Sequence, residues 1–187
     1  YKYAVRLRHS TKKEDINKAM EIFHAILTSD NLDDIDSSKA EIYRQLAKCL
    51  LRLEAYDQAE VSYGEAIKLY EAKGEAGWFL YYVRGITRER LDIWGLAEKD
   101  FRKALSLNPT QPQVLNYLGY SLIEKNSNLD EALDMIERAV KESPDSGYIV
   151  DSLGWGYYKL GQYEKAVPNL ERAAELMLSL IHISEPT

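Results

Sequence analysis

The sequence has few of the residues that form disulfide bonds, metal sites or redox sites. Its 187 residues include one cysteine, Cys49, and three histidines in unrelated positions, His9, His24 and His182. A single cysteine excludes an internal disulfide framework, and its apolar helical surroundings predict a buried, inert thiol. The histidines show no ligand spacing, so we expect neither a metal nor another cofactor.

Long apolar runs and clusters of basic residues are also missing. No segment reaches the roughly 18 uninterrupted apolar residues of a transmembrane helix. The formal net charge is −6, and charged stretches such as Lys12-Lys13-Glu14-Asp15 mix both signs. Nucleic acids and anionic membranes require a concentrated positive face, so we expect neither as the main partner. With only 5 prolines and 10 glycines, and 45% hydrophobic residues, the chain is free to form long regular elements around a core.

The sequence does contain a repeat with a period of 34 or 35 residues. Gly85, Gly119 and Gly154 mark the same position in three successive units. Each is followed by an alanine that has a large residue four positions later, and these pairs are Ala97 with Phe101, Ala132 with Ile136, and Ala166 with Leu170. Two weaker units precede them, carrying Ala47, Ala59 and Tyr63, and then Ala19 and Phe23. Self-similarity at this period is typical of helical repeat proteins.

The residue types indicate how each unit packs. Two antiparallel helices cannot bury their apolar faces alone, so neighbouring units stack. We expect the glycines and alanines where helices cross closely, with Phe101, Ile136 and Leu170 filling the space beside them. Pro109 and Pro144 are expected to end the second helix of their units, because proline lacks the amide hydrogen. Pro168 is expected near the start of the last helix, where proline is tolerated.

This pattern resembles the tetratricopeptide repeat family across roughly residues 3–177. The resemblance implies an all-α fold, a right-handed superhelical solenoid of antiparallel helix pairs. The expected repeats are 3–30 (partial), 40–70, 78–109, 112–144 and 147–177. Pentatricopeptide repeats are disfavoured because they are usually basic, and Sel1-like repeats because their glycine-rich turn is missing.

The two ends of the chain carry separate expectations. Residues 178–187 resemble a translated sequencing adaptor, so we expect a non-native tail, with an apolar capping helix as the alternative. The chain begins at Tyr1 without methionine, so we expect a piece of a longer protein. The Asp151-Ser152-Leu153-Gly154-Trp155 string resembles repeats of exported bacterial proteins, including lipoproteins, which implies the periplasm or envelope, with the cytoplasm as the alternative.

The resemblance also implies a concave surface lined by the first helix of each repeat. Six aromatic side chains occupy the positions that face it, as hot-spot residues of an interface would. Asn116 is expected to bind a ligand backbone, and the full set of expected groove residues is Arg44, Lys48, Phe79, Tyr82, Ile86, Asn116, Tyr120, Tyr148, Asp151, Trp155 and Tyr158. The known clamp for C-terminal carboxylates is absent, because Val83, Gln113 and Tyr117 occupy its positions. Packing of the aromatics against the next repeat stays open as an alternative.

The sequence therefore predicts a binding module for a peptide or protein, with no catalysis of its own. No nucleophile, phosphate loop or paired general acid and base stands out, and Glu124 with Asp130 is expected on a solvated helix face. Two alternatives stay open. One is a structural spacer in a multi-subunit assembly, with its groove filled by its own chain, and the other is a targeting arm for an enzyme domain outside these residues.

Overall fold

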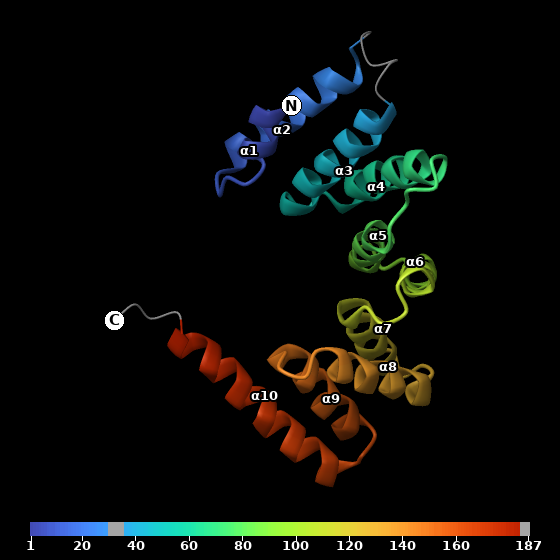
Figure 1. The fold of residues 1–187 in the computed structure, drawn as a ribbon, viewed down its shortest axis with the longest axis vertical. Helices are drawn as coiled ribbons and strands as arrows, with labels where there is room; N and C mark the ends of the chain where they lie inside the picture. The colour runs from blue at the N-terminus through green and yellow to red at the C-terminus, as the bar shows by residue number, and fades with distance from the viewer. Residues whose placement is uncertain (30–35, 184–187) are drawn as a thin grey trace. The chain divides into compact units, whose positions relative to one another are not determined.

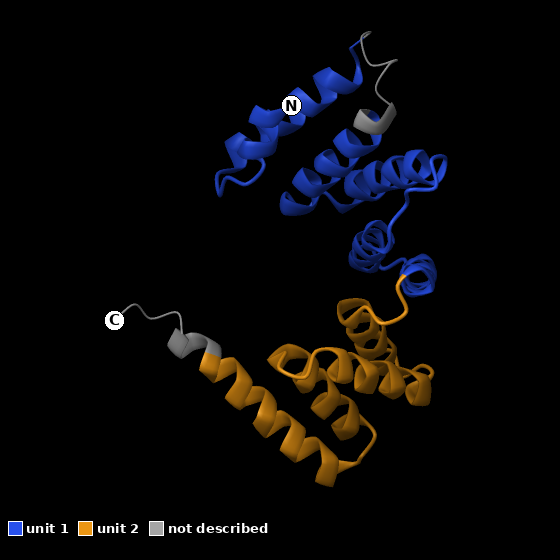
Figure 2. Cartoon of the chain, in the orientation of Figure 1, with its two compact units in different colours: residues 1–107 blue, residues 108–187 orange. Residues whose placement is uncertain are grey.

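A computed structural model describes residues 1–29 and 36–183, and these ranges are helical with no strand among them (Figure 1). Clustering of the contacts divides the chain into two compact units, residues 1–107 and 108–187 (Figure 2). Unit 1 contains α1 (Lys2–Leu7), α2 (Lys13–Leu27), α3 (Asp36–Arg52), α4 (Tyr56–Glu71), α5 (Trp78–Arg90) and α6 (Trp94–Leu107). Unit 2 contains α7 (Pro112–Glu124), α8 (Leu129–Glu142), α9 (Gly147–Lys159) and α10 (Tyr163–Ile183).

Consecutive helices form pairs that pack on one another. The pairs are α1 with α2, α3 with α4, α5 with α6, α7 with α8, and α9 with α10. Within unit 1, α2 also contacts α3 and α4 contacts α5, whereas within unit 2, α9 contacts both α7 and α8. The described residues are thus an all-α array of helix pairs, which confirms the predicted fold class.

The glycines of the repeat lie where two helices approach most closely, as predicted. A methyl group at Gly119 would sit 2.7 Å from the Ala132 carbonyl oxygen and 2.7 Å from Ile136 Cγ1. At Gly85 and Gly154 it would come within 2.7 Å of the side chains of the large residues in the same repeat, Phe101 and Leu170. The spacing of small and large residues in the sequence therefore corresponds to contacts between the two helices of each pair.

A left-handed residue ends the first helix of four successive pairs. These residues have φ between 52° and 71°, and they are Glu54, Asp92, Asn126 and Gly161. In each case the next amide donates a hydrogen bond of 2.9 Å to the carbonyl five residues earlier, as from Ser127 to Leu122. This is the Schellman arrangement, which satisfies carbonyls at the end of a helix. Asn128, with φ 47°, lies in the same turn, where the longer repeat places its extra residue.

The prolines follow the prediction at two positions and depart from it at a third. Pro109 and Pro144 come two residues after the ends of α6 and α8. Pro168 is the sixth residue of α10, which begins at Tyr163, so it lies near the helix start as expected but beyond the first turn, where proline is tolerated. Its ring removes the amide that would bond to the carbonyl of Glu164.

The final helix is longer than the sequence pattern predicts. α10 continues to Ile183, whereas the last repeat was expected to end at residue 177 and a non-native tail to follow. Residues 178–183 are therefore helical in the structure, while residues 184–187 of the expected tail, and residue 30 of the first expected repeat, lie outside the described residues.

A buried ion network joins three helices of unit 1. Arg84 donates two hydrogen bonds of 2.8 Å to the carboxylate of Asp100, whose side chain is only 5% exposed. Arg88 bridges Asp100, at 2.9 Å, and Glu60, at 2.7 Å. Because Glu60, Arg88 and Asp100 come from α4, α5 and α6, the network ties one helix pair to the next.

Candidate functional site

The predicted site residues of unit 2 lie together on two neighbouring helices, α7 and α9. Along α9, Tyr148, Asp151, Trp155 and Tyr158 follow three- and four-residue steps, which place them on one side of the helix. The α7–α9 face is defined here by Asn116, Tyr120, Glu124, Tyr148, Asp151, Trp155 and Tyr158. Three of its tyrosines are strongly exposed, with Tyr120 at 40%, Tyr158 at 48% and Tyr148 at 52%.

Trp155 is the centre of the contacts on this face. Its Nε1 donates a hydrogen bond of 2.6 Å to Glu124 of α7, which links the two helices. Its ring stacks on Tyr158 at a centroid distance of 5.4 Å. The ammonium group of Lys159 lies 5.5 Å from the Trp155 ring and 3.9 Å from the Glu124 carboxylate. Sequence reasoning missed Glu124 and Lys159 as site residues. Glu124 follows the predicted residue Tyr120 by one helical turn, and Lys159 follows Trp155 in the same way.

Asn116 differs from its neighbours because it is buried. Its side chain is 8% exposed, and its Oδ1 atom has no hydrogen-bond partner among the described residues. An unpaired buried acceptor costs roughly 1–3 kcal/mol, which a donor from a ligand or a bound water would recover. The Oδ1 atom is covered by neighbouring atoms as well as unpaired, so a ligand reaches it only if the Asn116 side chain turns outward.

The electrostatic character of the face is acidic. Partial burial raises the pKa of the Tyr120 hydroxyl, and the negative charges of Glu124 and Asp151 raise it further. Asp151 is exposed and forms no ion pair or side-chain hydrogen bond within residues 1–29 and 36–183. Asp151, unlike Glu124, therefore lacks a cationic partner among the described residues.

The predicted residues of unit 1 lie on α3 and α5, and several are engaged by neighbours. Arg44 donates to both carboxylate oxygens of Glu41, at 2.7 and 2.6 Å, so the expected basic spot is largely neutralised. Lys48 lies over the Phe79 ring at 5.9 Å. Tyr82 is half-buried, with its ring 6.2 Å from that of Phe101. Ile86 is also half-buried.

Glu41 is the hub of a polar cluster beside Arg44. Gln45 donates to its carboxylate, as do the hydroxyls of Tyr70, at 3.1 Å, and Tyr1, at 3.2 Å. Burial alone would raise the pKa of Glu41, but the hydrogen bonds and the charge of Arg44 outweigh it and lower the pKa to about 2. The cluster therefore holds a charged carboxylate at neutral pH.

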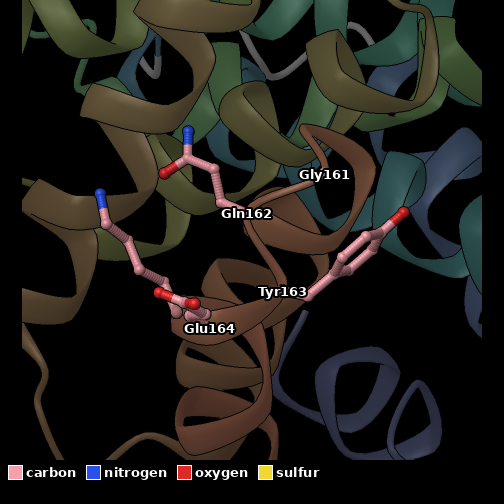
Figure 3. Close-up of a pocket in the computed structure, with 5 residues that line it drawn as sticks. Gly161, Gln162, Tyr163 and Glu164 are labelled. Carbon is pink, nitrogen blue, oxygen red and sulfur yellow. The ribbon is translucent and has the colours of Figure 1, made fainter.

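Two surface hollows lack the chemistry of a reaction site. One lies at the turn between α9 and α10 and is lined by Gly161, Gln162, Tyr163, Glu164 and Lys165. The side chains of Gln162 and Tyr163 diverge there, so no polar groups converge on a common point (Figure 3). In the other hollow, Tyr81 donates a hydrogen bond of 2.5 Å to Glu71, and Lys103 lies over the Tyr81 ring.

The described residues contain no group of three or more His, Cys, Asp or Glu side chains arranged to hold a metal ion. None of their helices combines the length and the apolar character needed to cross a membrane.

The fold and the repeated glycine contacts define the class of protein as a helical-repeat array, and the family follows from comparison with known sequences. Two family models, both described as tetratricopeptide repeat, match residues 82–147 and 152–176. The chain therefore contains tetratricopeptide repeats in these two ranges. Repeats of this family are generally non-catalytic scaffolds for protein interaction.

Solved structures show the same fold at low sequence identity. A crystal structure of MamA superposes with a TM-score of 0.76 at 19% identity, covering 91% of this chain and 93% of that one. YrrB, which is described as a tetratricopeptide-repeat protein with an unusual peptide-binding site, has a TM-score of 0.68 at 22% identity, covering 92% of this chain and 85% of its own.

Curated relatives are bacterial. The chain is 29% identical over 135 residues to a tetratricopeptide-repeat protein of Pseudomonas aeruginosa, which covers 72% of this chain and 22% of that protein. It is 39% identical over 90 residues to the lipoprotein NlpI homolog of Haemophilus influenzae, which covers 46% of this chain and 27% of that protein. The chain thus matches between about a fifth and just over a quarter of the length of these relatives.

Proposed function

We propose that the α7–α9 face binds an extended segment of a protein partner. The observation that carries this proposal is the combination of exposed aromatic rings with a buried acceptor, Asn116 Oδ1, that has no partner. Aromatic side chains contribute large contact areas at a small entropic penalty, and Tyr and Trp are enriched at binding hot spots. Asn116 would turn its side chain outward and accept a backbone N–H of the segment, which recognises any sequence, while the rings contact the side chains of the segment.

The structure supports a rigid mode of binding. Trp155 is held by its hydrogen bond to Glu124 and by its stacking on Tyr158, so its ring is already ordered without a ligand. Side chains that are ordered beforehand lose less conformational entropy when a ligand binds. Tyr120, on the neighbouring helix, adds a second exposed ring across from this pair.

The test uses a random library of twelve-residue peptides displayed on phage. Peptides enriched by the parent chain are synthesised, and their affinities for the parent and for Tyr120→Ala are compared by fluorescence anisotropy. We expect Tyr120→Ala to weaken binding at least ten-fold, because a hot-spot ring contributes on the order of 2 kcal/mol. Val167→Ala, an exposed position of α10 that is outside the face, serves as the control and should leave the affinity unchanged.

Two results would contradict this proposal. If no peptide is enriched above background, the face does not bind isolated segments, and the alternative of a structural spacer is favoured. If peptides bind Tyr120→Ala as tightly as the parent, the binding site lies elsewhere. Circular dichroism of the variant establishes that the comparison is between folded proteins.

Within unit 1, Arg44, Lys48, Phe79, Tyr82 and Ile86 are proposed as ligand contacts of that unit by itself. Lys48 and Phe79 carry most of this proposal, because Arg44 is paired with Glu41 and Tyr82 packs toward Phe101. For a peptide that binds unit 1, Phe79→Ala should therefore lower the affinity more than Tyr82→Phe does, since Phe79 is 41% exposed. Equal affinities for Phe79→Ala and the parent would remove Phe79 from the contacts of unit 1.

For the location of the protein, we infer the bacterial envelope. The support is the 39% identity to a lipoprotein homolog over 90 residues, and the cytoplasm is the alternative. Protease treatment of intact spheroplasts that express the whole protein tests this inference. An envelope protein exposed outside the inner membrane is digested, whereas a cytoplasmic one is protected.

A further inference from the structure

We propose that the α7–α9 face selects peptide segments that carry a lysine or arginine side chain, which sits against Trp155 between the carboxylates of Glu124 and Asp151. This inference rests on the proposed function, because it names the chemistry of the ligand that the face would take. The descriptions of the family and of the relatives given above mention no preference for basic segments.

The face combines the two groups that recognise an organic cation. The indole of Trp155 offers the most favourable ring for an ammonium or guanidinium group within about 6 Å of its centroid. Neighbouring carboxylates supply hydrogen-bond acceptors and negative charge. Glu124 is hydrogen-bonded to the indole itself, Asp151 precedes Trp155 by one helical turn, and the charges of both carboxylates act on the Tyr120 hydroxyl.

Lys159 shows that this place accepts a cation. Its ammonium group already lies 5.5 Å from the Trp155 ring and 3.9 Å from Glu124, the arrangement expected for a bound lysine side chain. The side chain of Lys159 is 39% exposed, and the distance to Glu124 is at the long end for an ion pair. An exposed lysine in such a loose pair is weakly held, so a ligand cation can displace it.

The charge distribution of the whole chain favours the same ligand. Residues 108–187 contain twelve Asp and Glu but six Lys and Arg, so unit 2 accounts for the entire net charge of −6. Residues 1–107 contain eighteen of each and are neutral. A face of negative potential speeds and favours the encounter with basic segments and opposes acidic ones.

Two substitutions on this face should change the affinity for basic peptides in opposite directions. Asp151→Asn removes the carboxylate that has no cationic partner, and it should weaken the binding of basic peptides by about three- to ten-fold. Lys159→Met removes the competing cation while keeping a long apolar stem, and it should strengthen the binding of the same peptides by about two- to five-fold. A face built for acidic segments would show the reverse in both variants.

The experiment uses the peptides enriched from the twelve-residue library. Each lysine or arginine of an enriched peptide is replaced in turn by norleucine, glutamine or glutamate, and the affinities are measured for the parent, Asp151→Asn and Lys159→Met. Asp145→Asn and Lys141→Met make the same changes of charge at exposed positions outside the face, so they control for the effect of net charge.

The outcomes separate this inference from the proposed function. We expect one basic position whose replacement weakens binding at least ten-fold, with Asp151→Asn and Lys159→Met changing affinity in opposite directions and both controls within two-fold of the parent. Enrichment of peptides that lack lysine and arginine would overturn the inference while leaving the peptide-binding function intact, and so would controls that match the face variants. Enrichment of no peptide would instead reject the proposed function.

Discussion

Gly119 offers a sharp test of the packing described above, because α7 and α8 meet there at van der Waals distance. In Gly119→Ala the new methyl group would lie 2.7 Å from the Ala132 carbonyl oxygen and from Ile136 Cγ1, and 3.3 Å from Met135 Cβ. A flexible side chain could rotate away, but a backbone oxygen inside α8 cannot. The two helices would have to separate, and this separation opens gaps along the rest of their interface.

The magnitude follows from two opposing effects. Alanine is favoured over glycine inside a helix by about 1 kcal/mol. Overpacking a tight core typically costs about 1–3 kcal/mol and more where the backbone must move. We expect a net destabilisation of about 2 kcal/mol for Gly119→Ala, which corresponds to a fall in melting temperature of roughly 4–8 °C for a chain of this length.

Gly64→Ala is the matched control, since Gly64 also lies inside a helix. Its added methyl group would be 3.9 Å from Arg84 Nη1, an ordinary contact, so only the helical preference changes. We expect Gly64→Ala to raise the stability by about 0.5–1 kcal/mol. Thermal unfolding followed by circular dichroism gives both values, and a Gly119→Ala variant as stable as Gly64→Ala would refute the close crossing of α7 and α8.

Three further predictions concern unit 1. Asp100→Ala leaves Arg84 and Arg88 buried without their shared carboxylate, and urea unfolding should show a loss of about 3 kcal/mol; a loss under 1 kcal/mol would mean that the network is not formed. The pKa of Glu41 is lowered to about 2 in the folded protein, compared with 4.5 for the ordinary side chain. The ionised carboxylate therefore contributes its full stabilisation above pH 4.5, and this stabilisation is lost as the pH falls toward 2. Glu41→Gln should therefore destabilise the protein by about 2 kcal/mol at pH 7 but little at pH 2, and an equal effect at both pH values would contradict this assignment. Cys49 is fully buried and burial raises its pKa to about 11, so it should resist a thiol reagent in the native state and react only after unfolding.

The sequence predicted the parts of the fold that depend on local spacing. The glycine of each repeat and the large residue of its second helix are separated by 16 or 17 residues, so their contact appears in the sequence as a repeated spacing. The helix pairs and the fold class followed from that repeated spacing. The left-handed turn residues Glu54 and Asp92 could not be predicted in this way, because neither is the glycine or asparagine typical of that conformation.

The candidate site was only partly predictable, because its chemistry depends on contacts between helices. The sequence placed Trp155 and Tyr158 on one side of a helix, and the structure stacks them. It did not indicate that Glu124, 31 residues earlier, accepts a hydrogen bond from Trp155. It predicted Tyr82 as a groove residue but did not indicate that the half-buried ring also packs toward Phe101. Such side-chain pairs depend on which helices are neighbours in space, so they produce no periodic pattern in the sequence.

The central claim is that the α7–α9 face binds a peptide segment, and fluorine NMR of the protein labelled with fluorotryptophan tests it most directly. The chain has three tryptophans, Trp78, Trp94 and Trp155, and only Trp155 lies on this face. Their signals are assigned by replacing each in turn with phenylalanine, and an enriched peptide is then titrated. We expect the Trp155 signal to shift in proportion to binding while the Trp94 signal stays in place. Saturated binding with an unmoved Trp155 signal would contradict the claim.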